Sequence, residues 1–452
     1  MKEVIKNELL KGPQIKCALP GPYARKILAE DEKYLSPSYT REYPLVVKKA
    51  EDVWVEDVDG NIFLDFTAGI GVCNVGHNNK EIRKVLAEQL DHYIHFALGD
   101  FYNDKAPLLA KELCNITPGQ YNKKAFFTNS GTESVEAAIK LARYHTRKPR
   151  ILGFIGAFHG RTMGSLAITS SKSVQRKHFS PLMGDVTHVP YPYCYRCPYK
   201  LTYPKCDFWC VKIIEEVYFK RLCPPEDIAC CIVEPIQGEG GYIVPPDGYF
   251  DELTKLLKKY DILIIADEVQ SGIGRTGKML ACEHWNFVPD IVCLAKALAN
   301  GLPLGAIVAN EKYYTWVKGS HNNTFGGNAL AVSAAIKTIE LVRNEYIENA
   351  KNMGDYILGV ARKWIDEYEF LGDVRGKGLM IGLEFVKNKQ TKEEAKELRN
   401  TIIYKCFEKG LLLLPSGENI IRFSPPLSIS KQQVDTALNI FNDVLQSVKS
   451  AL

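Results

Sequence analysis

Two short apolar runs that end in charged residues decide the fold: DILIIADEVQ at residues 261–270 and DIVCLAKALANG at residues 290–301. Similar runs occur from about residue 120 to 310, where they alternate with longer amphipathic segments. Nearly continuous apolar runs are typical of strands covered on both faces, and their alternation with helices is typical of βα units. The chain is therefore predicted to be an α/β protein with a large, mostly parallel sheet.

The two flanks of this region have a different pattern. Residues 44–66 alternate between apolar and polar side chains and turn at Asp59-Gly60, which is a hairpin signal. After residue 330 come helical patterns at 331–343, at 392–409 and from Lys431, with strand-like runs between them. We predict that residues 75–330 form the large domain, and that residues 1–74 and 331–452 together form a smaller α+β domain.

Composition excludes several classes of protein. The 57 Lys and Arg residues nearly balance 53 Asp and Glu residues, and the chain has no block of five or more like charges behind its net charge of +4. This balance argues against nucleic-acid and membrane-surface partners. The N-terminal MKEVIKNELLKG has no apolar core of signal-peptide length, and no stretch approaches the roughly 18 apolar residues of a membrane span. We expect a cytoplasmic protein.

Chemically capable residues follow the predicted strands. Ligands in an open α/β sheet gather at the carboxyl ends of the strands, so these residues are the candidates for a site. KAFFT leads into Asn129-Ser130-Gly131-Thr132 and a helix, which is either a phosphate cup or an ordinary helix cap. The candidates after the later strands are Phe158 and His159, Glu234 and Glu239, the run Asp267, Glu268, Val269 and Gln270, and Lys296.

Lys296 follows the apolar run directly. Burial would lower its pKa and make it a nucleophile, whereas a chain turn at Ala295 would let it point into water. A phosphate cup, a stacking ring, a carboxylate leaving a buried strand and a buried lysine together fit pyridoxal phosphate. This cofactor needs a lysine for its Schiff base, an acid for its pyridinium nitrogen and an anion site.

Six motifs carry a family resemblance: NSGTESVEAAIKLAR, GAFHGRTMGSLAIT, VEPIQGEGG, LIIADEVQSGIGRTG, LAKALANGLPLGA and TFGGNALA. In this order they resemble the class III (ornithine and 4-aminobutyrate type) pyridoxal-phosphate-dependent aminotransferases, over residues from about 40 to 445. The resemblance implies fold type I, pyridoxal 5'-phosphate as cofactor, and a homodimer with shared active sites, which could pair further as a dimer of dimers.

The resemblance also implies roles for individual residues. Lys296 would be the Schiff-base lysine and proton shuttle, Asp267 would hold the pyridinium proton, and Gln270 would reach the ring hydroxyl. The other residues expected to bind the cofactor are Val269 and Phe158 on the two ring faces, His159, Glu234, the phosphate-binding Ser130, Gly131 and Thr132, and Thr324 of the neighbouring subunit.

Four further residues concern the substrate. Arg422 in IIRFSPPL matches the family's carboxylate-binding arginine, and Glu239 matches the acid that pairs with it when an omega-amino group is admitted; Glu239 could also be a plain loop residue. Arg161 matches a distal-carboxylate position but discriminates little. Ile70 stands where ornithine enzymes resemble one another in carrying tyrosine, which argues against ornithine unless Ile70 is a core residue.

These residues predict an aminotransferase that moves the terminal amino group of a 4-aminobutyrate-like amino acid to 2-oxoglutarate, by a ping-pong Schiff-base mechanism. An amino-acid racemase of the same family needs the same residues and is the first alternative; ornithine or acetylornithine transfer is the second. A binding protein on an inactive enzyme fold would have lost Lys296, Asp267 or the phosphate cup, and all three are present.

Four of the 13 cysteines are clustered in YPYCYRCPYKLTYPKCDFWC, at Cys194, Cys197, Cys206 and Cys210. Their spacing is compatible with a structural zinc or iron–sulfur site, with two local disulfides, or with reduced thiols. The segment lies away from the strand ends, so we expect a structural role or a role at a dimer edge.

Overall fold

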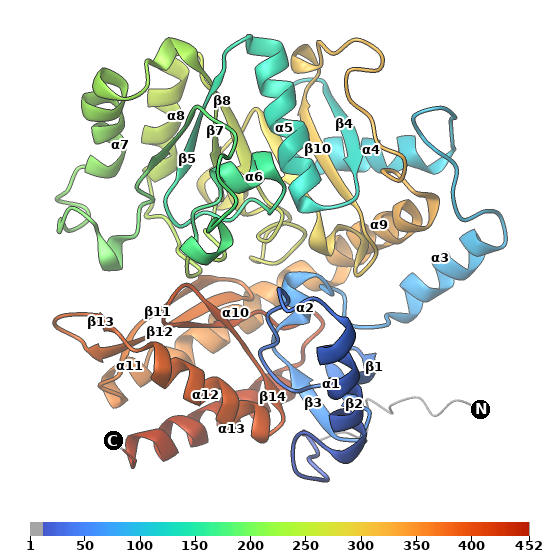
Figure 1. Ribbon diagram of the computed structural model, residues 1–452, viewed down its shortest axis with the longest axis vertical. Coiled ribbons are helices and arrows are strands. Elements are labelled where there is room, and N and C mark those ends of the chain that lie inside the picture. Colours follow the sequence, from blue (N-terminus) through green and yellow to red (C-terminus); the bar gives the residue numbers. More distant parts are fainter. Residues whose placement is uncertain (1–11, 452) are drawn as a thin grey trace.

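The structure, a computed structural model, describes residues 12–451. The segment 1–11, in which no signal peptide is predicted, lies outside the described residues. A seven-stranded sheet fills the upper part of Figure 1, in the order β4-β10-β9-β8-β7-β5-β6. Its strands are β4 (Lys123–Thr128), β5 (Arg150–Phe154), β6 (Val186–Val189), β7 (Ile228–Val233), β8 (Leu263–Asp267), β9 (Ile291–Leu294) and β10 (Gly305–Asn310).

Strand direction places the candidate residues at one edge of this sheet. Strands β6, β5, β7, β8 and β9 are parallel neighbours. Strand β10 is antiparallel to both β9 and β4, so β4 points the same way as the other five. The carboxyl ends of β4, β5, β7, β8 and β9 therefore meet at the same edge, as predicted. Strands β6 and β10 were not predicted.

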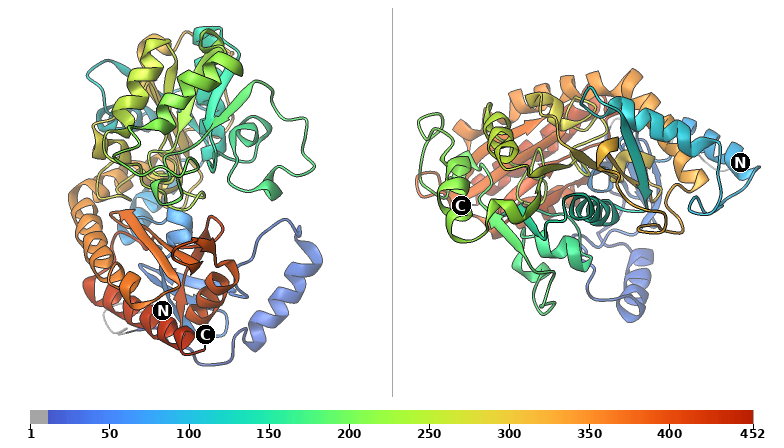
Figure 2. Two further views of the ribbon diagram at one scale, coloured as in Figure 1. Left: turned by 90° about the vertical axis from the view of Figure 1, so that its left-hand side faces the viewer. Right: turned by 90° about the horizontal axis from the view of Figure 1, so that it is seen from above.

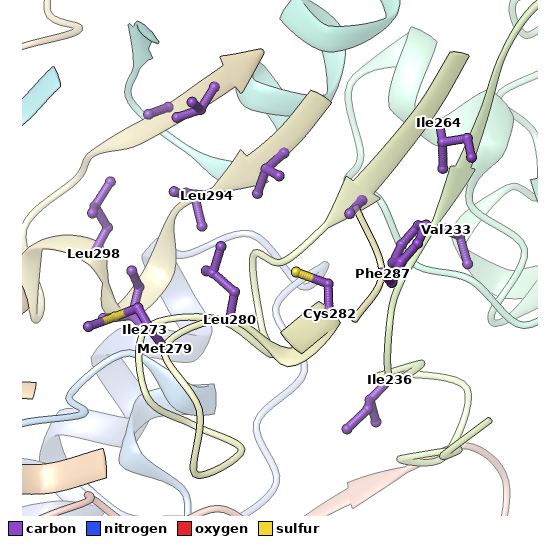
Figure 3. Close-up of a cluster of buried hydrophobic side chains, with 14 of the residues drawn as sticks. Val233, Ile236, Ile264, Ile273, Met279, Leu280, Cys282, Phe287, Leu294 and Leu298 are labelled. Atoms are coloured by element: carbon purple, nitrogen blue, oxygen red, sulfur yellow. The ribbon is translucent and has the colours of Figure 1, made fainter. Parts of the chain in front are cut away.

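Helices cover both faces of the sheet. On one face α5 and α6 pack against alternate strand residues, and on the other α4, α7, α8 and α9 pack around the largest apolar core. Figure 3 shows part of that core, where Ile264 and Leu294 from the strands lie near Leu280 and Phe287. The helices are α3 (Lys80–Leu90), α4 (Lys105–Ile116), α5 (Gly131–Thr146), α6 (Met163–Ile168), α7 (Trp209–Ile213), α8 (Tyr249–Lys259) and α9 (Ala329–Leu341).

Elements from the N-terminal and C-terminal parts of the described chain lie together in the lower part of Figure 1. Strand β3 pairs in parallel with β14, in the sheet order β1-β2-β3-β14, and a second sheet has the order β11-β12-β16-β15. The strands are β1 (Val47–Glu51), β2 (Trp54–Asp57), β3 (Ile62–Asp65), β11 (Leu371–Lys377), β12 (Met380–Asn388), β13 (Glu393–Glu394), β14 (Leu411–Leu412), β15 (Leu414–Ser416) and β16 (Ile420–Phe423). The domain limits given above stay a prediction.

The flanking helices agree broadly with the sequence pattern. They are α1 (Pro22–Tyr34), α2 (Ala68–Gly71), α10 (Ile347–Ala361), α11 (Trp364–Glu367), α12 (Lys396–Glu408) and α13 (Lys431–Lys449). Helix α12 begins four residues later than predicted, because Glu393 and Glu394 pair with β12 instead. The predicted hairpin is confirmed between β2 and β3, with Gly60 at φ 83° in the turn. Asp59 of that turn accepts N–H bonds from the start of α1, which stands away from the body in Figure 2.

Candidate functional site

Lys296 is the second residue after β9, at the start of a 3₁₀ turn that spans Lys296–Ala299. Its φ of 44° is in the left-handed region, which a non-glycine residue adopts only where the surroundings impose it. Lys296 is half-buried, so the alternative in which it points freely into water is wrong. Burial lowers the pKa of Lys296, and the nearby Asp267 and Glu239 offset this only in part.

Asp267 ends β8 and faces His159. Oδ2 of Asp267 lies 2.7 Å from Nδ1 of His159, and its Oδ1 accepts the N–H of Val269 at 3.0 Å. Burial lowers the pKa of His159, but the Asp267 carboxylate outweighs it and the pKa is raised overall. The next acid is also paired, since Glu268 accepts bonds from Ser271 Oγ and the N–H of Cys282. Both acids therefore tolerate burial, and Glu268 has a structural role.

Glu234 connects two loops at the same edge. Its Oε1 accepts the N–H of Phe158 at 2.9 Å, and its Oε2 accepts the N–H of Gly238 at 2.7 Å. Burial raises the pKa of Glu234 to about 7. Through these two backbone bonds Glu234 holds the loops of Phe158 and Gly238 in place.

The segment after β4 was predicted to be either a helix cap or a phosphate cup, and its geometry is compatible with both roles. Ser130 caps α5 by accepting the N–H of Glu133 at 3.3 Å, and the first-turn amides of Gly131 and Thr132 have no acceptor within the helix. A Cβ on Gly131 would lie 2.7 Å from Cγ1 of Val269, so glycine allows close packing there. The hydroxyl of Thr132 bonds to those of Thr162 and Ser165. This helix start is suited to an anion.

Arg422 and Glu239 form a buried ion pair. Nη1 of Arg422 lies 2.7 Å from Oε1 of Glu239, with side-chain exposures of 5% and 17%. Burial lowers the pKa of Arg422, but the charge of Glu239 outweighs this effect and the pKa is raised overall. Burial raises the pKa of Glu239, but the charge of Arg422 outweighs this effect and the pKa is lowered overall. Arg422 Nε has no partner among the described residues. Glu239 is thus more than a plain loop residue, since it neutralises the arginine.

Three predicted residues lie on the surface of the chain. Thr324 and Arg161 are exposed, and the Arg161 guanidinium lies 5.9 Å from the ring centroid of Phe158. Ile70 is 39% exposed at φ 68°, so the alternative that it is a core residue is wrong. Within residues 12–451 of one chain, the ion pair of Arg422 is with Glu239 and involves none of these three side chains.

The four-cysteine segment gives no support for a metal or cluster. All 13 cysteines are free thiols, so the disulfide alternative is not what the structure shows. Across residues 12–451, no group of three or more His, Cys, Asp or Glu side chains is arranged to hold a metal ion. Cys194 is exposed, whereas Cys210 is half-buried, and burial together with the neighbouring thiols raises the pKa of Cys210 to about 12.

Two arginines, the buried Arg275 and the mostly buried Arg375, were missed by sequence reasoning. Arg275 is 1% exposed and donates to the carbonyls of Leu379 and Pro425 and to Oδ1 of Asn74. Arg375 binds backbone and side-chain groups beside the Glu239 loop. Most of their partners lie far away in the sequence, and the one available signal was an arginine within the glycine-rich GIGRTG.

The class-III aminotransferase family model matches residues 35–445. The chain belongs to this family. It is 36% identical to the alanine/serine racemase of Pyrococcus horikoshii over 97% of this chain and 94% of that protein. It is 33% identical to the 4-aminobutyrate aminotransferase of Mycobacterium leprae over 96% of this chain and 98% of that protein.

Solved structures of the family have the same fold. An amine transaminase from an uncultivated Pseudomonas species, in its PLP-bound form, superposes with a TM-score of 0.85 at 28% identity, covering 92% of this chain and 98% of that chain. The protein thus has the PLP-dependent transferase fold of the class III aminotransferase family, with a large sheet of mostly parallel strands. None of the helices in residues 12–451 is long and apolar enough to span a bilayer.

The site also fits the family's cofactor on its own chemistry. Nε2 of His159 and Oε1 of Gln270 are buried polar atoms without partners in the described chain, and such atoms indicate a missing polar ligand. The start of α5 can bind a phosphate through its free amides. Lys296 can react with a carbonyl carbon, and Asp267 can accept a hydrogen bond from a protonated ring nitrogen. We therefore expect pyridoxal 5'-phosphate between these groups.

Proposed function

We propose that this enzyme transfers the terminal amino group of an omega-amino acid resembling 4-aminobutyrate to 2-oxoglutarate. The buried pair of Arg422 and Glu239 carries the proposal. An unpaired buried arginine is strongly unfavourable, so an enzyme that must admit a donor without a carboxylate beside the reacting carbon needs an acid to neutralise that arginine. An acceptor with a carboxylate at that point would take the place of Glu239.

The chain's own residues would divide the work as follows. Bound pyridoxal phosphate would supply the electron sink that makes the substrate C–H bond acidic. The lowered pKa of Lys296 increases the fraction of neutral amine, which can accept a proton at the substrate carbon and return it elsewhere. Asp267, held by His159, would keep a proton on the ring nitrogen, and Phe158 and Val269 would orient the ring. Arg161 would bind the distal carboxylate.

An amino-acid racemase is the second candidate, because the similarity to the alanine/serine racemase extends over almost the whole chain. Every racemase substrate has a carboxylate beside the reacting carbon, so Glu239 would have to leave Arg422 on each binding event. The ion pair therefore favours the aminotransferase.

One experiment separates the two functions. The purified holoenzyme is given 4-aminobutyrate alone and, separately, L-alanine alone, without any oxoacid. An aminotransferase releases about one aldehyde per active site from 4-aminobutyrate and then stops until 2-oxoglutarate is added. A racemase releases no aldehyde but continues to turn over alanine, and the optical rotation decays to zero; that result would refute the proposed function.

We also propose a homodimer in which Thr324 contributes to the active site of the neighbouring subunit. Two such dimers could pair further into a dimer of dimers. Phe325, which follows Thr324 in the chain, is 59% exposed. Two aromatic side chains of the 94–102 loop are also more than half exposed, Phe96 at 53% and Phe101 at 55%. Exposed apolar residues in a group are typical of subunit interfaces. The cytoplasmic location stays a prediction from the sequence.

A further inference from the structure

The loop that carries Glu239 has its backbone held on both sides. Ser416 Oγ donates to the carbonyl of Gly238 at 2.7 Å, and the N–H of Gly417 donates to the carbonyl of Glu239 itself at 2.8 Å. Arg375 donates to the next carbonyls, with Nη2 2.7 Å from Gly241 O and Nε 3.2 Å from Tyr242 O. With these four carbonyls bound, the backbone cannot follow if the Glu239 carboxylate leaves Arg422.

Arg375 is in turn fixed by a buried network. Its Nη1 lies 2.6 Å from both Oδ2 of Asp373 and Oε2 of Glu384, and its Nη2 donates to the Tyr193 hydroxyl at 2.9 Å. Glu384 is fully buried and also accepts bonds from Tyr193 and Arg196. Tyr193 and Arg196 belong to the segment with the four cysteines, so this segment braces the arginine that holds the loop.

We propose that Arg375 is a positioning residue for substrate selection: it holds the backbone of the Glu239 loop so that the Glu239 carboxylate rests on Arg422. The exchange between a paired and an open Arg422 is then a side-chain rotation of Glu239 on a fixed backbone. This inference deepens the proposed function and rests on Arg422 as the carboxylate-binding group.

The variant R375K isolates the backbone contacts. Lysine keeps the positive charge beside Asp373 and Glu384, but its single ammonium cannot reproduce the planar fork that reaches Gly241, Tyr242 and both acids together. D373N is the matched control, because it removes the negative charge beside Nη1 and leaves the bonds from Nε and Nη2 to the loop in place. If R375K does not fold, Y193F loosens Arg375 more gently.

The assay is the binding of glutarate to the holoenzyme by calorimetry, because this dicarboxylate has neither an amino nor an oxo group and cannot react. Glutarate must displace Glu239 from Arg422. A loosened loop weakens that competitor, so R375K should bind glutarate about threefold to tenfold more tightly, Y193F should shift in the same direction, and D373N should match the wild type. In an E239Q background, R375K should have no further effect.

The proposal would be overturned if R375K changed the glutarate Kd by the same factor in the wild-type and E239Q backgrounds, or if D373N produced the same shift as R375K. An unchanged or weaker affinity in R375K would overturn it as well. Glutarate binding does not depend on which amino donor is used, so a racemase result in the turnover experiment would leave this test intact.

Discussion

Replacing Glu239 with glutamine should change the two halves of the reaction in opposite directions. The charges of Arg422 and Glu239, with Nη1 and Oε1 2.7 Å apart, attract each other by about 4 kcal/mol at a charge separation of about 4 Å and an effective dielectric constant of about 20. Glutamine keeps a hydrogen-bond acceptor, and Glu239 is 17% exposed. We therefore expect E239Q to weaken the interaction free energy between residue 239 and Arg422 by about 1.5–3 kcal/mol, less than the full attraction.

The half-reaction with the amino donor should become slower in E239Q. In E239Q an omega-amino acid would meet an uncompensated guanidinium, and could also bind in reverse with its carboxylate on Arg422. The kcat/KM for 4-aminobutyrate should therefore fall by about tenfold to hundredfold. 2-Oxoglutarate no longer has to displace a carboxylate, so its kcat/KM should stay the same or rise.

The assay follows each half-reaction separately in single-turnover experiments. R422A is the counterpart: it should weaken 2-oxoglutarate far more than a donor amine without an alpha-carboxylate. A fall by the same factor for donor and acceptor in E239Q, or no change in either, would refute the reasoning and leave Glu239 as a structural partner of Arg422.

Two further predictions concern Lys296 and His77. K296A should fold and still bind pyridoxal phosphate, but transfer should fall by about 10³-fold or more, since neither the nucleophile nor the proton carrier remains. Mixing K296A with T324A subunits should restore activity, because one shared site then has both residues; no recovery would contradict the shared-site dimer. Burial lowers the pKa of His77, but its bonds to Asp65 and Cys73 outweigh this and raise the pKa to about 10. Below its ordinary pKa of about 6.5 this pair contributes its full stability, which is lost as the pH rises through about 10. Between about pH 6 and 10, the wild type should lose on the order of 4 kcal/mol of its advantage over H77Q in urea unfolding, and a constant difference would contradict the pairing.

The residues that gather at the carboxyl edge of the sheet could be predicted, because successive βα units place their strands parallel to one another. Once KAFFT, IACCIV, LIIAD and DIVCL are strands of one direction, the residues after them must meet, and Lys296 and Asp267 follow from chain order alone. The sequence also contained the hairpin at Gly60 and the cap at Ser130, because both depend on neighbours within four residues.

What escaped prediction depends on partners far apart in the chain. Strand β10 is a short apolar run, GAIVAN, that directly follows the Lys296 motif, and its reversed direction depends on pairing with β4, nearly two hundred residues earlier. The Arg375 network joins β11 and β12 to the four-cysteine segment, and no local pattern announces such a contact. Ile70 was ambiguous because its positive φ comes from the tertiary fold.

The pairing of β3 with β14 has a consequence for how the protein is made. Leu64 and Leu411 are register partners, so the first hairpin leaves the ribosome long before the strand that completes its sheet. During synthesis the edge of β3 stays open while the seven-stranded sheet can already form from the residues between them. Long-range pairing of this kind slows folding and exposes an unpaired edge to other chains. Assembly of the lower part should therefore be the late, aggregation-prone stage in the biogenesis of this enzyme.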